Sequence, residues 1–465
     1  MHPLARLLKP LEPLAPSDPS AAAAGGPSDS AAAVVCSVGE GAPERLTSGS
    51  WWLYARPGRE ADPGGELALF AGAGGRTFRC GRASDGTVTV PFGLAEAYTG
   101  FTAERYALAG SGRRIPVALQ NAYYLLKAAI PRRAQLAARR ALIRWQGEPD
   151  FPAWPADTSV SDLLGFWIRC ELVARSRSEL RFRWFWPGNA RAAAILTHDV
   201  ESAAGLRNAV RIADLEEERG MRSSFNVVAR EYPIDWGIVA HLRDRGFELG
   251  VHGVRHDRSM FRSREDFDAQ QPELRRMAER IGADGFRSPA THRVHEWLAD
   301  LPVAYDCTVP MSDPYEPQPG GCCSPWPYFI GPLVELPWSL SQDHTVLTLL
   351  GQRSPELWFR QIEIVERRAG LIQCLSHPDP GYLGDPRNEA VYAELLDFLA
   401  ERPTLWRALP REVAAWWRLR DDDGEAAGPI GLAVLDGDEV RLEPESDVRY
   451  ENQPTLSLPD APSAR

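Results

Sequence analysis

Two carboxylates follow a short apolar run in the segment AAAILTHDVE. Asp199 and Glu201 are separated by one residue, and only Thr197 and His198 lie between them and residues 193–196, which we expect to form a strand. In an extended backbone, residues two apart share a face, so both carboxylates would lie together. Two like charges that close repel each other unless a cation or an arginine lies between them. The pair suits a metal site, although acidic residues after a strand also suit the first turn of a helix.

A pair of histidines follows another apolar run, in FELGVHGVRHD. His252 directly follows the predicted strand 247–251, and His256 comes four residues later. If the chain turns into a helix there, this spacing puts both imidazoles on one side, within reach of one metal ion. Two histidines and one carboxylate are a common ligand set of catalytic zinc sites. The spacing alone also occurs by chance, so its position at a strand end is what favours a metal site.

A third histidine follows a strand pattern in the segment LIQCLSHPDP. His377 comes after the predicted strand 371–375 and precedes a proline. A lone histidine in such a place is more often a structural residue. A hydrolytic metal centre, however, needs a proton donor for its leaving group, and the unperturbed pKa of histidine suits that task near neutral pH. His377 is therefore a candidate general acid.

The elements that must position these residues alternate between strands and helices. Helical patterns separate the apolar runs at residues 202–219, 235–245, 264–281, 356–368 and 388–401. Such alternation predicts βαβ units and a parallel sheet or barrel. In these folds catalytic groups gather at the carboxyl ends of the strands, which is where all three motifs lie.

Together and in this order, the three segments resemble the polysaccharide deacetylases of carbohydrate esterase family four, which include chitin, peptidoglycan and nodulation-factor deacetylases. The resemblance covers about half of the chain, from residue 192 to about residue 420. It implies an α/β fold class with a distorted (β/α) barrel. It also implies hydrolysis of N-acetyl groups from an amino sugar, oligosaccharide or polysaccharide, with Zn²⁺ or with Co²⁺, Ni²⁺ or Fe²⁺ as the metal.

The resemblance assigns the catalytic base and the metal ligands. The base falls on Asp199, and the H-x-x-x-H metal pair falls on His252 and His256. The commonest first motif of the family reads T-F-D-D-G, with the metal-binding carboxylate directly after the base. This chain reads T-H-D-V-E, with valine at position 200. A D-V-D or D-V-E variant has its metal carboxylate one residue later, and Glu201 fits that variant.

The resemblance also assigns roles in two later motifs. The R-x-P motif appears as RSP at residues 287–289, in which Arg287 would orient the base. The backbone N–H of Ala290, after that proline, would help to hold the oxyanion. The late L-x-H motif has Leu375 as a wall of the pocket and His377 as the general acid.

Composition divides the whole chain into parts. Residues 13–33 are rich in Ala, Ser, Pro and Gly, a composition typical of flexible segments, whereas the segment DFPAWPAD suggests a boundary near residue 150. We expect a flexible leader over 1–33, an N-terminal accessory α/β region of unknown function over 34–150, a connector over 151–190, the catalytic domain over 191–420 and an acidic tail with one or two possible strands over 421–465. Residues 117–145 read as a basic amphipathic helical stretch, which suits packing, a partner or a membrane surface.

Charge and hydropathy limit the classes of function. The formal net charge of −11 argues against nucleic-acid binding, which normally needs a basic surface. No stretch approaches the roughly 18–20 apolar residues of a membrane span, and we find no signal peptide, so we expect a cytoplasmic location by default.

The seven cysteines show no C-x-x-C spacing and are expected to be reduced. Nothing in the pattern indicates an oligomeric state.

Three other functions stay open from the sequence. One is the same chemistry on another amide, such as an N-formyl sugar or a small ureide. Another is an inactive carbohydrate-binding or scaffold protein that kept the fold. The third is a metal-binding regulator whose N-terminal part carries the main function. The joint presence of Asp199, Arg287 and His377 weighs against a binder, because binding needs neither a base nor an acid.

Overall fold

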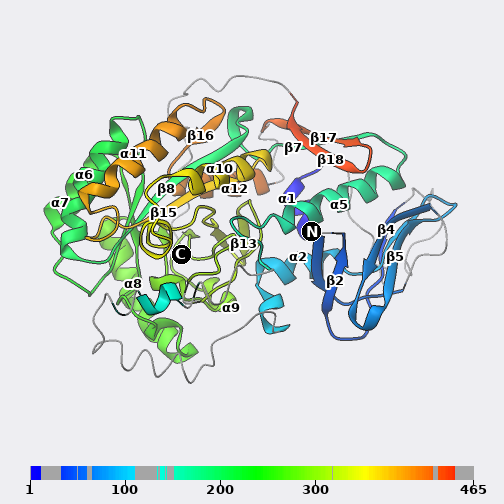
Figure 1. Cartoon of the computed structure of the whole chain (residues 1–465), viewed down its shortest axis with the longest axis horizontal. Helices are drawn as coiled ribbons and strands as arrows, with labels where there is room; N and C mark the ends of the chain where they lie inside the picture. The colour runs from blue at the N-terminus through cyan, green and yellow to red at the C-terminus, as the bar shows by residue number, and fades with distance from the viewer. Residues whose placement is uncertain are drawn as a thin grey trace.

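The fold is that of a computed structural model of the chain. The residues that it describes are 2–11, 33–49, 51–59, 65–109, 151–316, 318–422 and 428–445, with a few positions between 134 and 143. Figure 1 shows a smaller N-terminal sheet on one side of the molecule and a larger sheet with its helices on the other.

The larger sheet carries all the motifs identified in the sequence. Within the described ranges it has nine strands, all paired in parallel except β13 with β14. In pairing order they are β13 (Tyr328–Ile330), β14 (Leu333–Glu335), β12 (Tyr305–Asp306), β11 (Gly285–Phe286), β10 (Glu248–Val251), β9 (Ser224–Val227), β8 (Ala192–Val200) and β15 (Leu371–Ser376), with β16 (Leu405–Arg407) also on β8. The predicted α/β class, a distorted barrel of alternating strands and helices, is confirmed.

Burial explains why these strands read as continuous apolar runs. Every residue of β8, β9, β10 and β15 is buried. Strands of a parallel sheet covered on both faces lack polar alternation, because both faces meet apolar neighbours. The polar residues that such strands do carry therefore need local partners.

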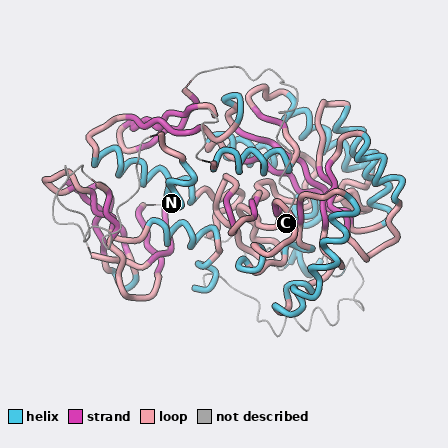
Figure 2. Tube along the Cα trace, turned by 180° about the vertical axis from the view of Figure 1, so that it is seen from behind, coloured by secondary structure: helices cyan, strands magenta, loops and turns pink. Residues whose placement is uncertain are grey.

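Helices cover the larger sheet and connect its strands. They are α6 (Ala203–Glu217), α7 (Trp236–Asp244), α8 (Arg264–Ile281), α9 (His295–Leu298), α10 (Glu356–Arg367), α11 (Pro386–Ala400) and α12 (Pro410–Asp421). Seen from behind, the strands lie inside a layer of helices (Figure 2). Side-chain caps start several of them: Ser202 accepts from Gly205 N, and Ser263 accepts from Asp266 N.

The N-terminal region forms a separate, mainly antiparallel sheet. Its strands are β1 (Val34–Cys36), β2 (Glu44–Ser48), β3 (Trp51–Ala55), β4 (Gly65–Ala71), β5 (Thr77–Arg82) and β6 (Val88–Val90), followed by α2 (Leu94–Thr102) and the short 3₁₀ helix η3 (Arg105–Ala109). A third sheet pairs β7 (Glu179–Arg183) and β18 (Glu439–Pro444) on either side of β17 (Ile430–Asp436). The strands predicted in the tail therefore form.

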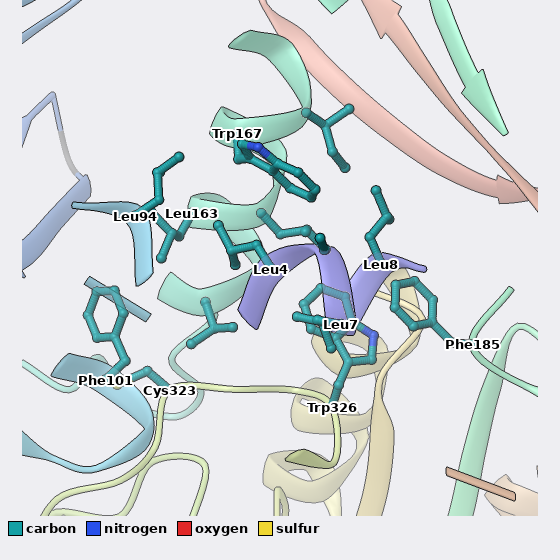
Figure 3. Packing of buried hydrophobic residues seen from close by; sticks show 14 of the residues in the cluster. Leu4, Leu7, Leu8, Leu94, Phe101, Leu163, Trp167, Phe185, Cys323 and Trp326 are labelled. Atoms are coloured by element: carbon teal, nitrogen blue, oxygen red, sulfur yellow. The ribbon is translucent and has the colours of Figure 1, made fainter. Parts of the chain in front are cut away.

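Two segments that the sequence reading left without regular structure contain helices. Residues 3–8, within the predicted leader, form helix α1 (Pro3–Leu8), in which Leu4 and Leu8 are fully buried. The predicted connector contains the long helix α5 (Ser159–Ala174) and strand β7. Figure 3 shows α1 packed between Trp167 of α5 and the Phe185 and Trp326 side chains. The apolar side chains of α1 and α5 join one buried cluster with Phe185 and Trp326, a set of long-range contacts that the local composition of these segments does not reveal.

Some expectations fall on other parts of the chain. Residues 12–32 of the predicted leader and most of the helical stretch predicted over 117–145 lie outside the described residues. No helix in the described ranges combines the length and apolarity needed to cross a bilayer. All seven cysteines are free thiols.

A buried carboxylate joins the middle of the larger sheet to its last helix. Glu248, at the start of β10, accepts a hydrogen bond from Tyr305 Oη at 2.6 Å and from the backbone N–H of Arg411 at 3.1 Å. The tyrosine ring crosses β11 at Gly285, where a Cβ would lie 2.0 Å from Tyr305 Cζ. Burial raises the pKa of Glu248 to about 7.

The unfolding free energy should therefore depend on the charge of Glu248. Its folded-state pKa of about 7 exceeds the ordinary value of 4.5. Protonated Glu248 therefore stabilises the folded state. This contribution to the unfolding free energy is complete below the ordinary pKa and is lost as the pH rises through the folded-state pKa. Relative to Glu248→Gln, the wild type should lose up to about 3 kcal/mol between about pH 5 and pH 8. Denaturant unfolding across this range measures the effect, and a pH-independent difference between the two proteins would contradict it.

Candidate functional site

Segments that are far apart in the sequence meet at one edge of the larger sheet. Strand β8 runs beside β15, with His198 opposite Ser376, and β10 runs beside β11, with Val251 opposite Phe286. Because these strands are parallel, the residues that follow them emerge at the same edge. The side chains gathered there are Asp199, Glu201, His252, His256, Arg287 and His377.

Three of these residues form a possible metal-binding group. One ligand atom each from Glu201, His252 and His256 lies within 4.8 Å of the other two. His252 Nδ1 donates to the carbonyl oxygen of Arg287 at 3.0 Å, which leaves the lone pair on Nε2. That Nε2 atom is buried and has no hydrogen-bond partner among the residues that the structure describes. A buried, unpaired imidazole nitrogen beside a carboxylate and a second imidazole fits a divalent transition metal.

The protonation states of Glu201 and His252 suit metal binding. Burial lowers the pKa of His252 to about 4, so the imidazole is neutral at physiological pH. Burial opposes the charge of Glu201, but the hydrogen bond with His256 and the His377 charge bring its pKa below the usual range. The His256 pKa is raised in turn, because the Glu201 contact, at 2.9 Å between Nε2 and Oε1, outweighs burial. Glu201 and His252 therefore already have their ligand forms.

Asp199 lies beside this group at the end of β8 and is 3% exposed. Its Oδ1 atom accepts a hydrogen bond from Asn226 Nδ2 at 2.9 Å and lies 3.9 Å from Arg287 Nε. Its Oδ2 atom lies 3.8 Å from His252 Nε2. Burial would raise the pKa of Asp199, but electrostatic interactions with His252 and with the Arg287 guanidinium bring it below its usual value. Asp199 is thus an ionised carboxylate with Oδ2 facing the ligand atom of His252.

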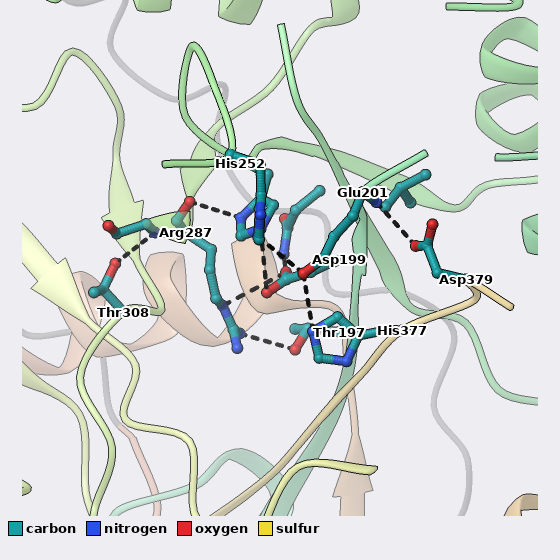
Figure 4. Close-up of polar contacts among 12 residues, drawn as sticks. Thr197, Asp199, Glu201, His252, Arg287, Thr308, His377 and Asp379 are labelled. Carbon is teal, nitrogen blue, oxygen red and sulfur yellow. Dashed lines mark hydrogen bonds and ion pairs between the residues drawn. The ribbon is translucent and has the colours of Figure 1, made fainter. Parts of the chain in front are cut away.

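Arg287 follows β11 and is fully buried. Its Nη2 atom donates to Thr197 Oγ1 at 2.9 Å, and Figure 4 shows its side chain reaching across toward Thr197 and Asp199. At 3.9 Å the contact with Asp199 is electrostatic rather than a hydrogen bond. Arg287 is therefore held in place by Thr197 while its charge acts on Asp199.

His377 lies on the other side of Glu201, directly after β15. Its Nε2 atom is 3.6 Å from Glu201 Oε1, and its Nδ1 atom is 2.7 Å from Asp343 Oδ1. Burial would lower the pKa of His377, but the Asp343 carboxylate raises it to about 10. The imidazole is therefore protonated at neutral pH, with Nε2–H directed toward the site.

Asp343 is a site residue that the sequence reasoning missed. It is fully buried and also accepts hydrogen bonds from the backbone N–H groups of His377 at 3.0 Å and Leu383 at 3.2 Å. It precedes the irregular helix η8 (His344–Leu349), and its segment SLSQDHTV has no strand or helix pattern that would reveal the contact.

Two other supporting residues were also missed. Asp379 accepts a hydrogen bond from Glu201 N at 2.9 Å and another from Ser202 Oγ, so it fixes the turn that carries Glu201. Asn226 lies in β9, where an amide inside an otherwise buried strand was a usable signal of a polar partner nearby.

Two predicted residues lie where the motifs place them, but their roles stay predictions. Ala290 belongs to the turn η7 (Pro289–Thr291) and has a positive φ of 49°. That turn packs on the loop between His252 and His256, since a Cβ at Gly253 would lie 2.7 Å from Pro289 Cγ. Leu375 is buried in β15 and pairs with Thr197 of β8.

The histidine next to the predicted base is buried, and both of its ring nitrogens contact protein groups away from the site. His198 points away from the site, as strand alternation predicts, with Nε2 2.7 Å from Glu216 Oε1 and Nδ1 2.8 Å from Ser376 Oγ. Tyr392 donates to the same Glu216 oxygen at 2.5 Å. This buried network joins α6, α11 and β15 beneath the site.

The chain has similarity in structure, but not in sequence, to known proteins. No family model matches it, and no curated protein matches it in sequence. Among solved structures, a protein from Mycobacterium smegmatis described as a polysaccharide deacetylase is 18% identical, with a TM-score of 0.42, over 51% of this chain and 94% of its own. Puue allantoinase is 15% identical, with a TM-score of 0.42, over 51% of this chain and 93% of its own. A protein from Pseudomonas aeruginosa PAO1 described as a polysaccharide deacetylase is 15% identical, with a TM-score of 0.40, over 51% of this chain and 94% of its own.

Replacing one imidazole should remove metal binding. His252→Ala should weaken the affinity for Zn²⁺ or Co²⁺ by more than about 100-fold, because it deletes a buried Nε2 ligand atom that has no hydrogen-bond partner among the described residues. His241→Ala, at an exposed histidine of α7, is the matched control and should bind metal like the wild type. Equilibrium dialysis followed by metal analysis measures both, and equal metal content in the two variants would exclude the proposed ligand set.

Proposed function

We propose that this protein is a metal-dependent hydrolase that removes N-acetyl groups from an amino sugar within an oligosaccharide or polysaccharide. One observation carries the proposal: an ionised carboxylate and a protonated imidazole, Asp199 and His377, flank a group of two histidines and a carboxylate that fits a divalent metal. Amide hydrolysis needs a base for the water and an acid for the amine, and this arrangement supplies both.

Glu201, His252 and His256 would hold the metal in this proposal. When bound, a divalent cation lowers the pKa of a coordinated water from about 15.7 to about 7 and polarises the substrate carbonyl. The donor set accepts Zn²⁺, and it also suits Co²⁺, Ni²⁺ or Fe²⁺. Glu201 is kept in position by Asp379, whose carboxylate binds its backbone N–H.

Asp199 would receive the proton of the attacking water on Oδ2. Its Oδ1 accepts the hydrogen bond from Asn226, whereas its Oδ2 faces His252 Nε2 at the metal-binding group. Oδ2 is therefore the oxygen available to the water. The charge of Arg287 keeps the carboxylate ionised until the water attacks the acetamide carbon. The Ala290 N–H would then donate to the oxygen on which negative charge develops.

His377 would give its Nε2 proton to the departing amine as the C–N bond breaks. Asp343 accepts the Nδ1–H and so stabilises the doubly protonated imidazolium and keeps it oriented with its transferable Nε2 proton toward the site. The products are acetate and the free amino sugar. Asp343 acts through His377 and is therefore a positioning residue.

A protein that only binds carbohydrate would not need this arrangement. Burying Asp199 and Glu201 as ions opposes folding unless compensating charges surround them. The compensation here comes from His377, Arg287 and the histidine pair, all directed at the same small region. Such concentrated, perturbed groups at strand ends are typical of an active site.

Loss of the base should abolish turnover and leave metal binding intact. Asp199→Asn should lower the kcat for acetate release from an N-acetylglucosamine oligosaccharide by about 10²–10⁴-fold, because the amide cannot accept the proton. Asp214→Asn, at a largely exposed carboxylate of α6, is the matched control and should retain wild-type kcat. Unchanged acetate release by Asp199→Asn would remove Asp199 from the mechanism.

The general acid can be tested with two leaving groups. His377→Ala should lower kcat on the N-acetyl sugar by about 10²–10⁴-fold while metal content stays at the wild-type level. With p-nitrophenyl acetate, whose leaving group needs no proton, the loss should be less than about 10-fold. Asp199→Asn should lose activity on both substrates. Equal losses of His377→Ala on the two substrates, or a loss of metal, would contradict the assignment of His377 as the acid.

A further inference from the structure

A buried ion pair connects the N-terminal region to the loop that follows Arg287. Glu104, between α2 and η3, accepts from Arg293 Nε and Nη2, both at 2.5 Å. The side chain of Arg293 is 1% exposed and that of Glu104 is 12% exposed. The same guanidinium donates through Nη1 to the carbonyl oxygen of Thr291 at 2.9 Å. One arginine therefore binds both the N-terminal region and its own loop.

The side chain of Gln318 hydrogen-bonds to the backbone of Arg293. Arg293 N donates to Gln318 Oε1 at 3.0 Å, and Gln318 Nε2 donates to Arg293 O at 3.1 Å. The loop after β11 is thus tied to the segment 318–321. Tyr106, two residues after Glu104, binds that segment as well: its hydroxyl donates to Gly321 O at 2.6 Å and accepts from Gly321 N at 2.9 Å.

The backbone around Glu104 is adapted to this contact. Glu104 itself has a positive φ of 51°, a conformation that non-glycine residues rarely adopt. Across from it, a Cβ at Gly320 would lie 2.5 Å from Glu104 Oε1, so a side chain at this position would displace the carboxylate from the ion pair. The cost of the strained backbone must be offset by the ion pair and the packing around it.

The loop held in this way includes the turn that carries Ala290. Both Ala290 and Thr291 have positive φ values, 49° and 52°, so this turn persists only if its surroundings enforce it. Pro289 is fixed against Gly253, beside His252, at one end of the turn. Arg293 fixes the other end through Thr291 O.

We propose that the N-terminal region completes the active site, with Glu104 as a positioning residue that acts through Arg293 to hold the turn carrying the Ala290 N–H. This inference rests on the proposed function, because the turn matters to catalysis only if Ala290 stabilises an oxyanion. It assigns a role to the N-terminal region, for which the sequence indicated none.

The energetics favour a strong coupling. The two charges are almost completely removed from water and make a bidentate contact, the geometry in which an arginine–carboxylate pair is strongest. Burial would lower the pKa of Arg293, but the Glu104 charge keeps it above its usual value. Removing Glu104 leaves a buried cation without its carboxylate, so the guanidinium must move toward solvent and release Thr291.

The test uses the full-length, Zn²⁺-loaded protein and an N-acetylglucosamine oligosaccharide. Glu104→Ala should lower kcat by up to about 10²-fold, because a misplaced donor weakens stabilisation of the transition state but not of the bound substrate. KM should stay within about two-fold, and metal content should equal that of the wild type. The backbone hydrogen bond from Arg287 N to Val251 O still holds the ends of β11 and β10 together in the variant. Glu104→Gln, which keeps the shape and one acceptor oxygen, should retain more kcat than Glu104→Ala.

The matched control is Glu96→Ala. Glu96 pairs with Arg56 within the N-terminal region, at 2.8 Å between Arg56 Nε and Glu96 Oε1, and this variant should keep wild-type kcat. Wild-type kcat in Glu104→Ala would overturn the proposal. If Glu104→Ala does not fold, the comparison of Glu104→Gln with Glu96→Ala decides in the same way.

Hydrogen–deuterium exchange separates this proposal from the proposed function. In the Glu104 variants, exchange should rise in peptides that cover residues 287–293 and 318–321, while peptides from β8 and β15 stay protected. If this exchange pattern is found but the wild-type protein releases no acetate, the result would support the role of Glu104 in holding the loop and would contradict the proposed deacetylase function. A uniform rise over the whole chain would show that the pair only stabilises the fold, and would overturn the positioning role.

Discussion

The structure depends on keeping two carboxylates charged where burial opposes the charge, since Asp199 is 3% exposed and the Glu201 side chain is 25% exposed. Burial raises the free energy of Asp199 and Glu201 as ions. The protein offsets this with imidazoles, the Arg287 guanidinium and the Asn226 amide, which arrive from different strand ends. A divalent cation among Glu201 and the histidine pair would supply the remaining compensation, which is why we interpret the cluster as a catalytic metal site.

That requirement explains the supporting residues around the site. Asp343 and Asp379 do not belong to the metal-binding group. Asp343 binds two backbone N–H groups and the His377 imidazole, and Asp379 binds the backbone N–H of Glu201 and the Ser202 hydroxyl. The parallel sheet provides the frame, because its buried strands leave polar side chains only at their ends and at a few positions such as Thr197. Catalytic groups can therefore be concentrated at one edge without disturbing the core.

The N-terminal region belongs to the same folded body rather than to a tethered accessory. Helix α1 packs between α5 and the larger unit, and Arg6 binds Asp421 at the end of α12 at 2.8 Å. The Glu104–Arg293 pair lies on this shared surface and reaches into a loop of the site. Under the proposed function, activity would depend on this surface, because a change at the Glu104–Arg293 pair alters the loop that begins at Arg287.

The sequence by itself determined the alternation of strands and helices and the residues at the strand ends. Buried parallel strands read as apolar runs, and strand ends are fixed by local pattern, so Asp199, His252 and His377 could be identified with their positions. Only the tertiary structure decided which residues complete the site. Asp343 and Glu104 meet His377 and Arg293 across long stretches of chain, and such contacts leave no local period or motif. They arise from how separate elements pack, which no short segment of the sequence encodes.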